Sequence, residues 1–367
     1  MAAREVAKAQ CRKENQPLAP PMDASGRGEE TRNIQSVLHS ATAADIPTGD
    51  RAPIVISDDQ PLVDALKFIA DAWVRACPVR DTSTNTIIGT LDLRDIGQFM
   101  VQMHRSGASE LEKGTGSRAD TGSDRNVLME FIASKNVPLE QLARKRPFTI
   151  VKPTTTLLEL ARTMSSGSHI VGISSEGRGD MPGGIGKVIT QGMLFKYLVP
   201  HLQNLSVPVH DVMKAPIITV KCSSNALKCF EIMINKKISG LGVVDEDGLL
   251  IHNTSTSDIK MLITAPDLED LSLNQSIEDF LVQLRSLQAS HKTRVPVSSC
   301  NEDDEMKSAV AKLAKTGYHR VWVTNANKEP VGVMSLSDLF RNLVSERPFA
   351  KSHMSDAPFC HVTCSLM

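Results

Sequence analysis

Three aspartates stand at the same place in three similar segments of the chain, at the start of a helix-like pattern. They are Asp95, Asp258 and Asp338. A carboxylate in the first turn of a helix can accept hydrogen bonds from both hydroxyls of a ribose, because each of its oxygens carries lone pairs. A fourth similar segment has Met193 at this place. The pattern therefore predicts a ribose-binding carboxylate in three of the four segments.

Hydroxyl residues three positions before these sites permit a second interpretation. They are Ser255, Ser335 and Thr190. A Ser or Thr followed three residues later by an acid is typical of a capping box, which satisfies free N–H groups in the first turn of a helix. The two roles are compatible, because the hydroxyl can cap the helix while the acid points outward. All three hydroxyls are therefore kept as candidate nucleotide contacts.

A second set of candidates consists of basic residues at the start of the first core strand of these segments. They are Arg75, His169, His319 and Arg320. Each could donate charge-assisted hydrogen bonds to phosphate oxygens, although a lone polar residue at a strand end more often faces solvent. In the segment that contains His169, Ile170 stands at the position equivalent to Arg320. In another segment, Ser239 and Gly240 stand at the positions equivalent to His319 and Arg320. This thinner basic set puts phosphate affinity in question.

These residues recur within a strand-turn-strand-helix unit, which is clearest between residues 317 and 344. Val321–Val323 predicts a strand, 324–330 a polar turn, Val331–Met334 a second strand, and Ser335–Asp338 the start of a helix. An amphipathic helix precedes each copy. Because a unit of this size cannot bury its own apolar faces, the copies must pack together. The predicted fold class is α+β, with a β-α-β-β-α unit repeated four times.

The repeats divide the chain into segments of different composition. Repeats one to four are expected at residues 43–105, 138–203, 206–264 and 276–345. The polar residues 1–42 are predicted to be disordered, and 106–137 to form a flexible linker rich in Gly, Ser and charge. No clear pattern extends into the tail at 346–367.

The overall composition excludes several classes of partner. A net charge of −1 gives no electrostatic reason to expect nucleic acid or an anionic membrane as the main partner. No apolar run approaches the roughly 20 residues that span a bilayer, and the first residues lack the apolar core of a secretory signal. Seven irregularly spaced cysteines favour free thiols in a reduced compartment. The expected location is the cytoplasm, with the nucleus left open.

Signals of catalysis and of metal binding are weak. The glycine-rich stretch 177–187 lacks the spacing of a phosphate-binding P-loop, and no G-x-S-x-G elbow, H-E-x-x-H helix or kinase motif set is present. Cys360, His361 and Cys364 lack a fourth ligand, so no metal site is predicted. A single active centre would also give no reason for four copies of one unit. The sequence therefore predicts a protein that is not an enzyme and needs no cofactor.

Four such units in two pairs resemble the tandem CBS-domain architecture, which implies two modules that form a flattened disc. His319 and Arg320, followed by the S-x-x-D run of Ser335–Asp338, resemble the gamma regulatory subunit of AMP-activated and sucrose-nonfermenting-type protein kinases. Residues 188–191 (VITQ) and 262–267 (LITAPD) are similar to its plant branch. The resemblance covers residues 43–345, most clearly in repeat four and weakly in repeat two.

The resemblance implies a non-catalytic subunit of a heterotrimeric kinase, with a catalytic alpha subunit and a beta-type subunit as partners. AMP, ADP and ATP would compete as regulatory ligands for clefts between repeats, with the aspartates on ribose and the basic residues on phosphate. In that family the second repeat likewise lacks the aspartate. Two alternatives stay open: a gamma-like interaction protein that no longer responds to nucleotide, and a CBS module for another adenosyl ligand such as S-adenosylmethionine.

Overall fold

The computed structural model of the chain describes residues 34–49, 52–72, 74–113, 137–175, 184–203, 205–260, 272–289 and 297–345. The predicted tail at 346–367, most of the predicted linker and the Cys360–Cys364 segment lie outside these residues.

Each repeat forms its own three-stranded sheet. The strands are β1 Ile56–Ser57, β2 Ala76–Arg80 and β3 Ile87–Asp92; β4 Ile150–Val151, β5 Ile170–Ser174 and β6 Ile185–Thr190; β7 Thr219–Lys221, β8 Gly240–Val244 and β9 Leu250–Ser255; β10 Ser299–Asn301, β11 Arg320–Thr324 and β12 Pro330–Ser335. In every sheet the first strand pairs parallel with the second, and the second antiparallel with the third. A parallel pair requires a crossover, and a helix supplies it each time. The predicted β-α-β-β-α unit is confirmed.

The helices fall into three groups. The crossover helices are α3 Leu62–Asp71, α7 Leu157–Ser165, α9 Ala226–Asn235 and α12 Met306–Thr316. The helices that follow the third strands are α4 Leu93–Lys113, α8 Gln191–Leu202, the 3-10 helix η4 Thr256–Lys260 and α13 Leu336–Leu343. The remaining helices are α2 Ile34–Ser40, η1 Ala43–Asp45, α6 Leu139–Ala143, η3 Val209–Asp211 and α11 Ile277–Ala289. No helix in the described ranges is both long and apolar enough to cross a membrane.

Two predicted boundaries are wrong. Residues 34–42 are ordered rather than disordered, because Ile34, Val37 and Leu38 share one face of α2, which packs against α7 and α8. Helix α4 continues through residues 106–113, where the linker was expected to begin. Residues 110–113 (ELEK) are good helix formers and carry the helix past Gly107.

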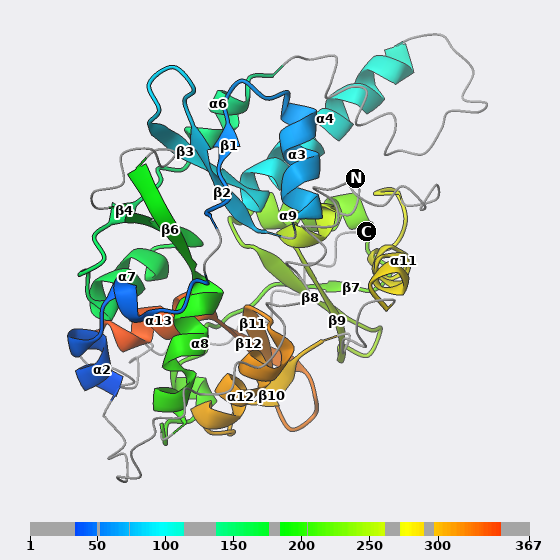
Figure 1. The fold of residues 1–367 in the computed structure, drawn as a ribbon. Coiled ribbons are helices and arrows are strands. Elements are labelled where there is room, and N and C mark those ends of the chain that lie inside the picture. The colour runs from blue at the N-terminus through cyan, green and yellow to red at the C-terminus, as the bar shows by residue number, and fades with distance from the viewer. Residues whose placement is uncertain are drawn as a thin grey trace.

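Two hydrophobic cores hold the four repeats together, and each core is shared by alternate repeats. The first contains buried side chains of repeats one and three together with those of α6 and α11. The second contains those of α2 and of repeats two and four, together with Val209 and Val212. Helix α4 packs against α9 and η4, while α7 and α8 pack against α13. Consecutive repeats instead meet through their strands and turns, as where Leu250 N donates to Lys328 O at 3.4 Å. The repeats therefore lie around a ring in the order one, two, four, three (Figure 1).

Candidate functional site

The predicted basic residues meet where the four repeats converge. Arg75 begins the chain segment that enters β2, His169 precedes β5, and His319 and Arg320 stand at the start of β11. Burial holds the pKa of His319 well below its ordinary value, and positive charge on Arg75, His169 and Arg320 lowers it further. The Nδ1 atom of His319 is buried and has no hydrogen-bond partner among the described residues. His319 is therefore neutral at pH 7, within a cluster of cations.

Arg75 is the least compensated cation of this cluster. Burial and the nearby Arg320 lower the pKa of Arg75 to about 10, although Asp92 and Asp258 partly oppose the shift. Its guanidinium is still charged at pH 7. Within the described part of the chain, no carboxylate lies close enough to form an ion pair with it. A half-buried cation beside like charge would be stabilised by a bound anion.

Arg320 is held in place by repeat three. Its Nη2 atom donates to Ser239 O at 2.9 Å and to Ser239 Oγ at 3.0 Å. A Cβ atom at Gly240 would lie 1.4 Å from Arg320 Nη1, so the absence of a side chain there makes room for the guanidinium. Burial lowers the pKa of Arg320, while the charges of Asp258 and Asp338 raise it. Ser239 and Gly240 thus form the binding site of the Arg320 side chain. Their replacement of the His-Arg pair found in repeat four therefore has a structural role.

His169 is held by a carboxylate that the sequence interpretation missed. Asp92 is 1% exposed, and its Oδ2 lies 3.0 Å from His169 Nδ1. Arg94 donates to both Asp92 oxygens, at 2.8 Å each, and to Gly167 O at 2.9 Å. Burial alone would raise the pKa of Asp92, but Arg94 and His169 hold it well below its ordinary value. This network joins repeat one to repeat two.

A signal for Asp92 was present in the sequence. Asp92 stands three residues before Asp95, at the place that Ser255 and Ser335 occupy in repeats three and four. An acid at a helix N-cap is ordinary, so its position in the unit does not reveal that it also binds His169 and Arg94.

The capping interpretation is confirmed for Ser335 and Thr190, and in part for Ser255. Ser335 Oγ and N both donate to Asp338 Oδ2, at 2.5 and 3.0 Å, and Asp338 N donates back to Ser335 Oγ. Ser255 N donates to Asp258 Oδ2 at 2.7 Å, and Thr190 Oγ1 accepts from Met193 N at 3.1 Å. The hydroxyls of Ser335 and Thr190 thus accept from the first turn of a helix, whereas at Ser255 it is the Asp258 carboxylate that accepts.

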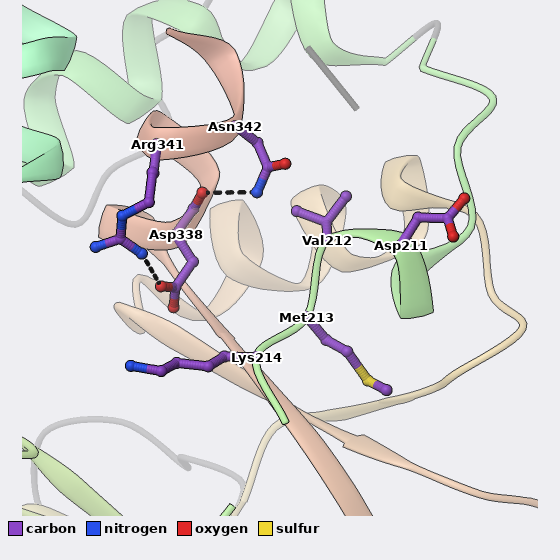
Figure 2. Close-up of a pocket in the computed structure, with 7 residues that line it drawn as sticks. All are labelled: Asp211, Val212, Met213, Lys214, Asp338, Arg341 and Asn342. Atoms are coloured by element: carbon purple, nitrogen blue, oxygen red, sulfur yellow. Dashed lines mark hydrogen bonds and ion pairs between the residues drawn. The ribbon is translucent and has the colours of Figure 1, made fainter. Parts of the chain in front are cut away.

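Asp338 lines a pocket of about 210 Å³ between repeats three and four. The other lining residues are Asp211, Val212, Met213, Lys214, Arg341 and Asn342. The Oδ1 atom of Asp338 accepts from Arg341 Nη1 at 2.7 Å, and Figure 2 shows the carboxylate between the side chains of Arg341 and Lys214. Because the charge of Asp338 also acts on Arg320, the pocket lies within the field of the central cations. A ligand here would meet the carboxylate of Asp338 and the cations of Lys214 and Arg341.

Asp95 has a different environment from the other two aspartates. It is buried, and Arg146 donates to both of its oxygens, through Nε to Oδ2 and through Nη2 to Oδ1. The predicted ribose carboxylate of repeat one is therefore occupied by a guanidinium from the chain itself.

Comparison with known proteins agrees with this geometry. The model of the CBS domain family matches residues 43–101, 209–263 and 290–345, which fall on repeats one, three and four. These repeats are CBS domains. The crystal structure of protein MJ1225 from Methanocaldococcus jannaschii, a proposed archaeal homologue of the AMPK gamma subunit, shares the fold with a TM-score of 0.62 at 15% identity. That likeness covers 82% of this chain and 99% of the archaeal one.

The curated relatives of these CBS repeats carry two kinds of name. Protein sds23 from Neosartorya fischeri is 24% identical over 284 residues, which is 73% of this chain and 50% of the relative. The SNF1-related protein kinase regulatory subunit gamma-1-like of Arabidopsis thaliana is 27% identical over 136 residues, 36% of this chain and 30% of the relative. The chain thus spans half or less of the length of these relatives.

The described residues of the CBS repeats contain neither a metal-binding cluster nor a disulfide. No group of three or more His, Cys, Asp or Glu side chains there could hold a metal ion. Cys77, Cys222, Cys229 and Cys300 are all unpaired thiols, and burial raises the pKa of Cys77 and Cys229 to about 12. Such buried thiols are poor nucleophiles.

Proposed function

We propose that this chain is a non-catalytic regulatory protein that binds an adenine nucleotide where its CBS repeats meet. The phosphate would be held by Arg75, His319 and Arg320, and the ribose by Asp338. Arg75 carries this proposal, because it is a half-buried cation beside a second one, without an ion pair among the described residues. A phosphate would supply the missing counter-charge, and the adjacent pocket would accept the nucleoside.

The kinase assignment is the finer part of the proposal. The nucleotide would act within a heterotrimer of the AMPK and sucrose-nonfermenting type, in which the catalytic alpha subunit and a beta-type subunit are the partners. The Arabidopsis gamma-1-like relative and the archaeal structure support it. A nucleotide can switch such a complex only through the difference between its affinities for the two states. Copurification of the tagged chain with alpha and beta subunits tests this assignment.

A second candidate is an interaction protein with other partners and no response to nucleotide. Protein sds23 from Neosartorya fischeri favours it, because it matches 73% of this chain against 36% for the kinase relative. The Arg146 contact at Asp95 agrees with it, since that carboxylate is already occupied.

A thermal-shift titration with AMP, ADP, ATP and S-adenosylmethionine decides between these candidates. A ligand at 100 times its Kd stabilises a protein by about 2.7 kcal/mol, which gives a readable change in Tm. We expect a shift with adenine nucleotides in the wild type and in Lys221→Ala, which removes a cation from an exposed surface pair. Arg75→Ala should lose the shift without lowering the Tm of the free protein, because the substitution relieves repulsion from Arg320.

Other outcomes of this titration are equally informative. No shift with any ligand would overturn the nucleotide proposal and leave the interaction protein as the better account. A shift with S-adenosylmethionine alone would assign the pocket to a different adenosyl ligand. An equal shift in the wild type and in Arg75→Ala would remove Arg75 from the phosphate site.

A further inference from the structure

The surroundings of Asp95 and Asp338 are built from equivalent elements. Thr90 N donates to Arg146 O at 2.9 Å, so the segment before β4 runs along β3. Val333 N donates to Lys214 O at 3.1 Å, so the segment before β7 runs along β12 in the same way. Thr90 and Val333 stand five residues before their aspartates. Arg146 and Lys214 therefore occupy equivalent places beside the two carboxylates.

Glycines let both segments approach closely. A Cβ atom at Gly89 would lie 2.1 Å from Ala143 O, and one at Gly332 would lie 2.3 Å from Met213 Sδ. The backbone of Ala143 thus fixes the course of the chain toward Arg146. The position of Arg146 beside Asp95 is built into the fold of repeats one and two.

The two basic residues differ in what they do at the carboxylate. The planar guanidinium of Arg146 donates from two nitrogens to the two oxygens of Asp95. Two parallel donors are also what a ribose diol would present. Lys214 forms no ion pair with Asp338 in the described structure. Asp338 instead accepts from Ser335 on Oδ2 and from Arg341 on Oδ1, one donor nitrogen of an exposed surface side chain, and a pocket of about 210 Å³ lies there. A lysine is a flexible point charge and cannot fill both acceptor positions as an arginine fork does.

We propose that Arg146 is a specificity-determining residue that takes the place of a nucleotide ribose on Asp95 and keeps the cleft between repeats one and two closed. This inference rests on the proposed function, since it concerns which of the equivalent clefts accepts an adenine nucleotide. The cleft at Asp338 accepts the ligand, and the cleft at Asp95 accepts one only after Arg146 has left. Arg146 is about one-third exposed while Asp95 is buried, so the arginine can swing into solvent and expose the acid.

Calorimetric titration of the full chain with AMP tests this inference through the number of sites. The wild type should bind at one site, which Asp338→Ala removes. Arg146→Ala should bind at a second site, and Asp95→Asn in the Arg146→Ala background should weaken that site by at least about tenfold. Arg144→Ala is the matched control, because Arg144 lies on the same segment but pairs only with the exposed Glu140. It should leave the number of sites unchanged.

A second variant guards against a loss of folding in Arg146→Ala, which leaves a buried carboxylate unpaired. Arg146→Lys keeps the positive charge but loses the bidentate fork, and it should show the second site with weaker affinity. One site in the wild type and in both Arg146 variants would overturn the role of Arg146 while the proposed function stands. No site in the wild type would overturn the proposed function. No site in the Arg146 variants would overturn this inference as well.

Discussion

The two sides of the ring use equivalent positions for different purposes. Between repeats three and four, Arg320 sits against Gly240, and Asp338 faces a pocket. Between repeats one and two, the positions equivalent to Gly240 and Arg320 hold Ala76 and Ile170, which are both buried. On the first side Asp338 borders a pocket while it pairs with the exposed Arg341, whereas on the second side Asp92 and Asp95 pair with Arg94 and Arg146.

The histidines show the same contrast. His169 lies 3.0 Å from the Asp92 carboxylate, which Arg94 also binds. His319 has no carboxylate within ion-pair distance in the described structure, although the Nδ1 atoms of both histidines lack a hydrogen bond of good geometry there. One repeat unit can therefore place its histidine beside a carboxylate or beside cations, and the difference depends on a few residues at the strand ends.

The largest effect is expected where Asp338 and Asp95 are compared directly. Asp338→Ala should abolish the Tm shift produced by AMP, while Asp95→Asn should leave it unchanged, because Asp338 lines a pocket whereas Asp95 is held by Arg146. Ser335→Ala separates capping from binding. It should destabilise the protein by about 1 kcal/mol through the lost cap and keep the nucleotide shift. Equal losses of the shift in the two aspartate variants would break the comparison.

The sequence predicted the repeating unit and most of the central cluster. Strand and helix periodicity within 60 residues or so defines each repeat, and the register of the strand ends brings Arg75, His169, His319 and Arg320 together. The alignment of the repeats also predicted that repeat two has Met193 at the position where the other repeats have an aspartate. These features depend on position within one unit, which a single sequence records directly.

Contacts between repeats could not be predicted in this way. The pairing of Asp95 with Arg146 joins residues 51 positions apart, and Arg320 reaches Ser239 across 81 positions. Nothing local to Gly240 indicates that its missing side chain admits a guanidinium from another repeat. The order of repeats around the ring was equally hidden, because apolar helix faces do not specify which partner covers them.

A smaller effect is expected from adding a side chain at Gly240, where the Arg320 guanidinium packs. In Gly240→Ala the new methyl group would overlap the guanidinium, which must then leave Ser239. We expect a loss of about 1–3 kcal/mol in the free energy of unfolding, measured by urea denaturation, and a weaker affinity for AMP. Gly192→Ala is the matched control, because its nearest neighbours would be 3.8 and 3.9 Å away, and it should be tolerated. A Gly240→Ala variant as stable as Gly192→Ala would show that Arg320 has another resting place.

The smallest effect is the pH dependence that follows from the contrast between His319 and His169. Burial and neighbouring positive charge place the pKa of His319 well below 6.5 in the folded state, so the unfolded chain binds more protons below that pH. Stability should therefore fall as the pH drops through and below about 6.5. His319→Gln should flatten this fall in urea denaturation between pH 7.5 and 5.5.

The matched variant for this measurement is His169→Gln. Burial also lowers the pKa of His169, but the Asp92 carboxylate opposes the shift, so His169→Gln should flatten the curve less. AMP should flatten the curve of the wild type, because a phosphate beside His319 favours its protonated form. The effect of AMP should vanish in His319→Gln. A pH dependence that AMP leaves unchanged would place the phosphate away from His319 and would erase the distinction between the two histidines.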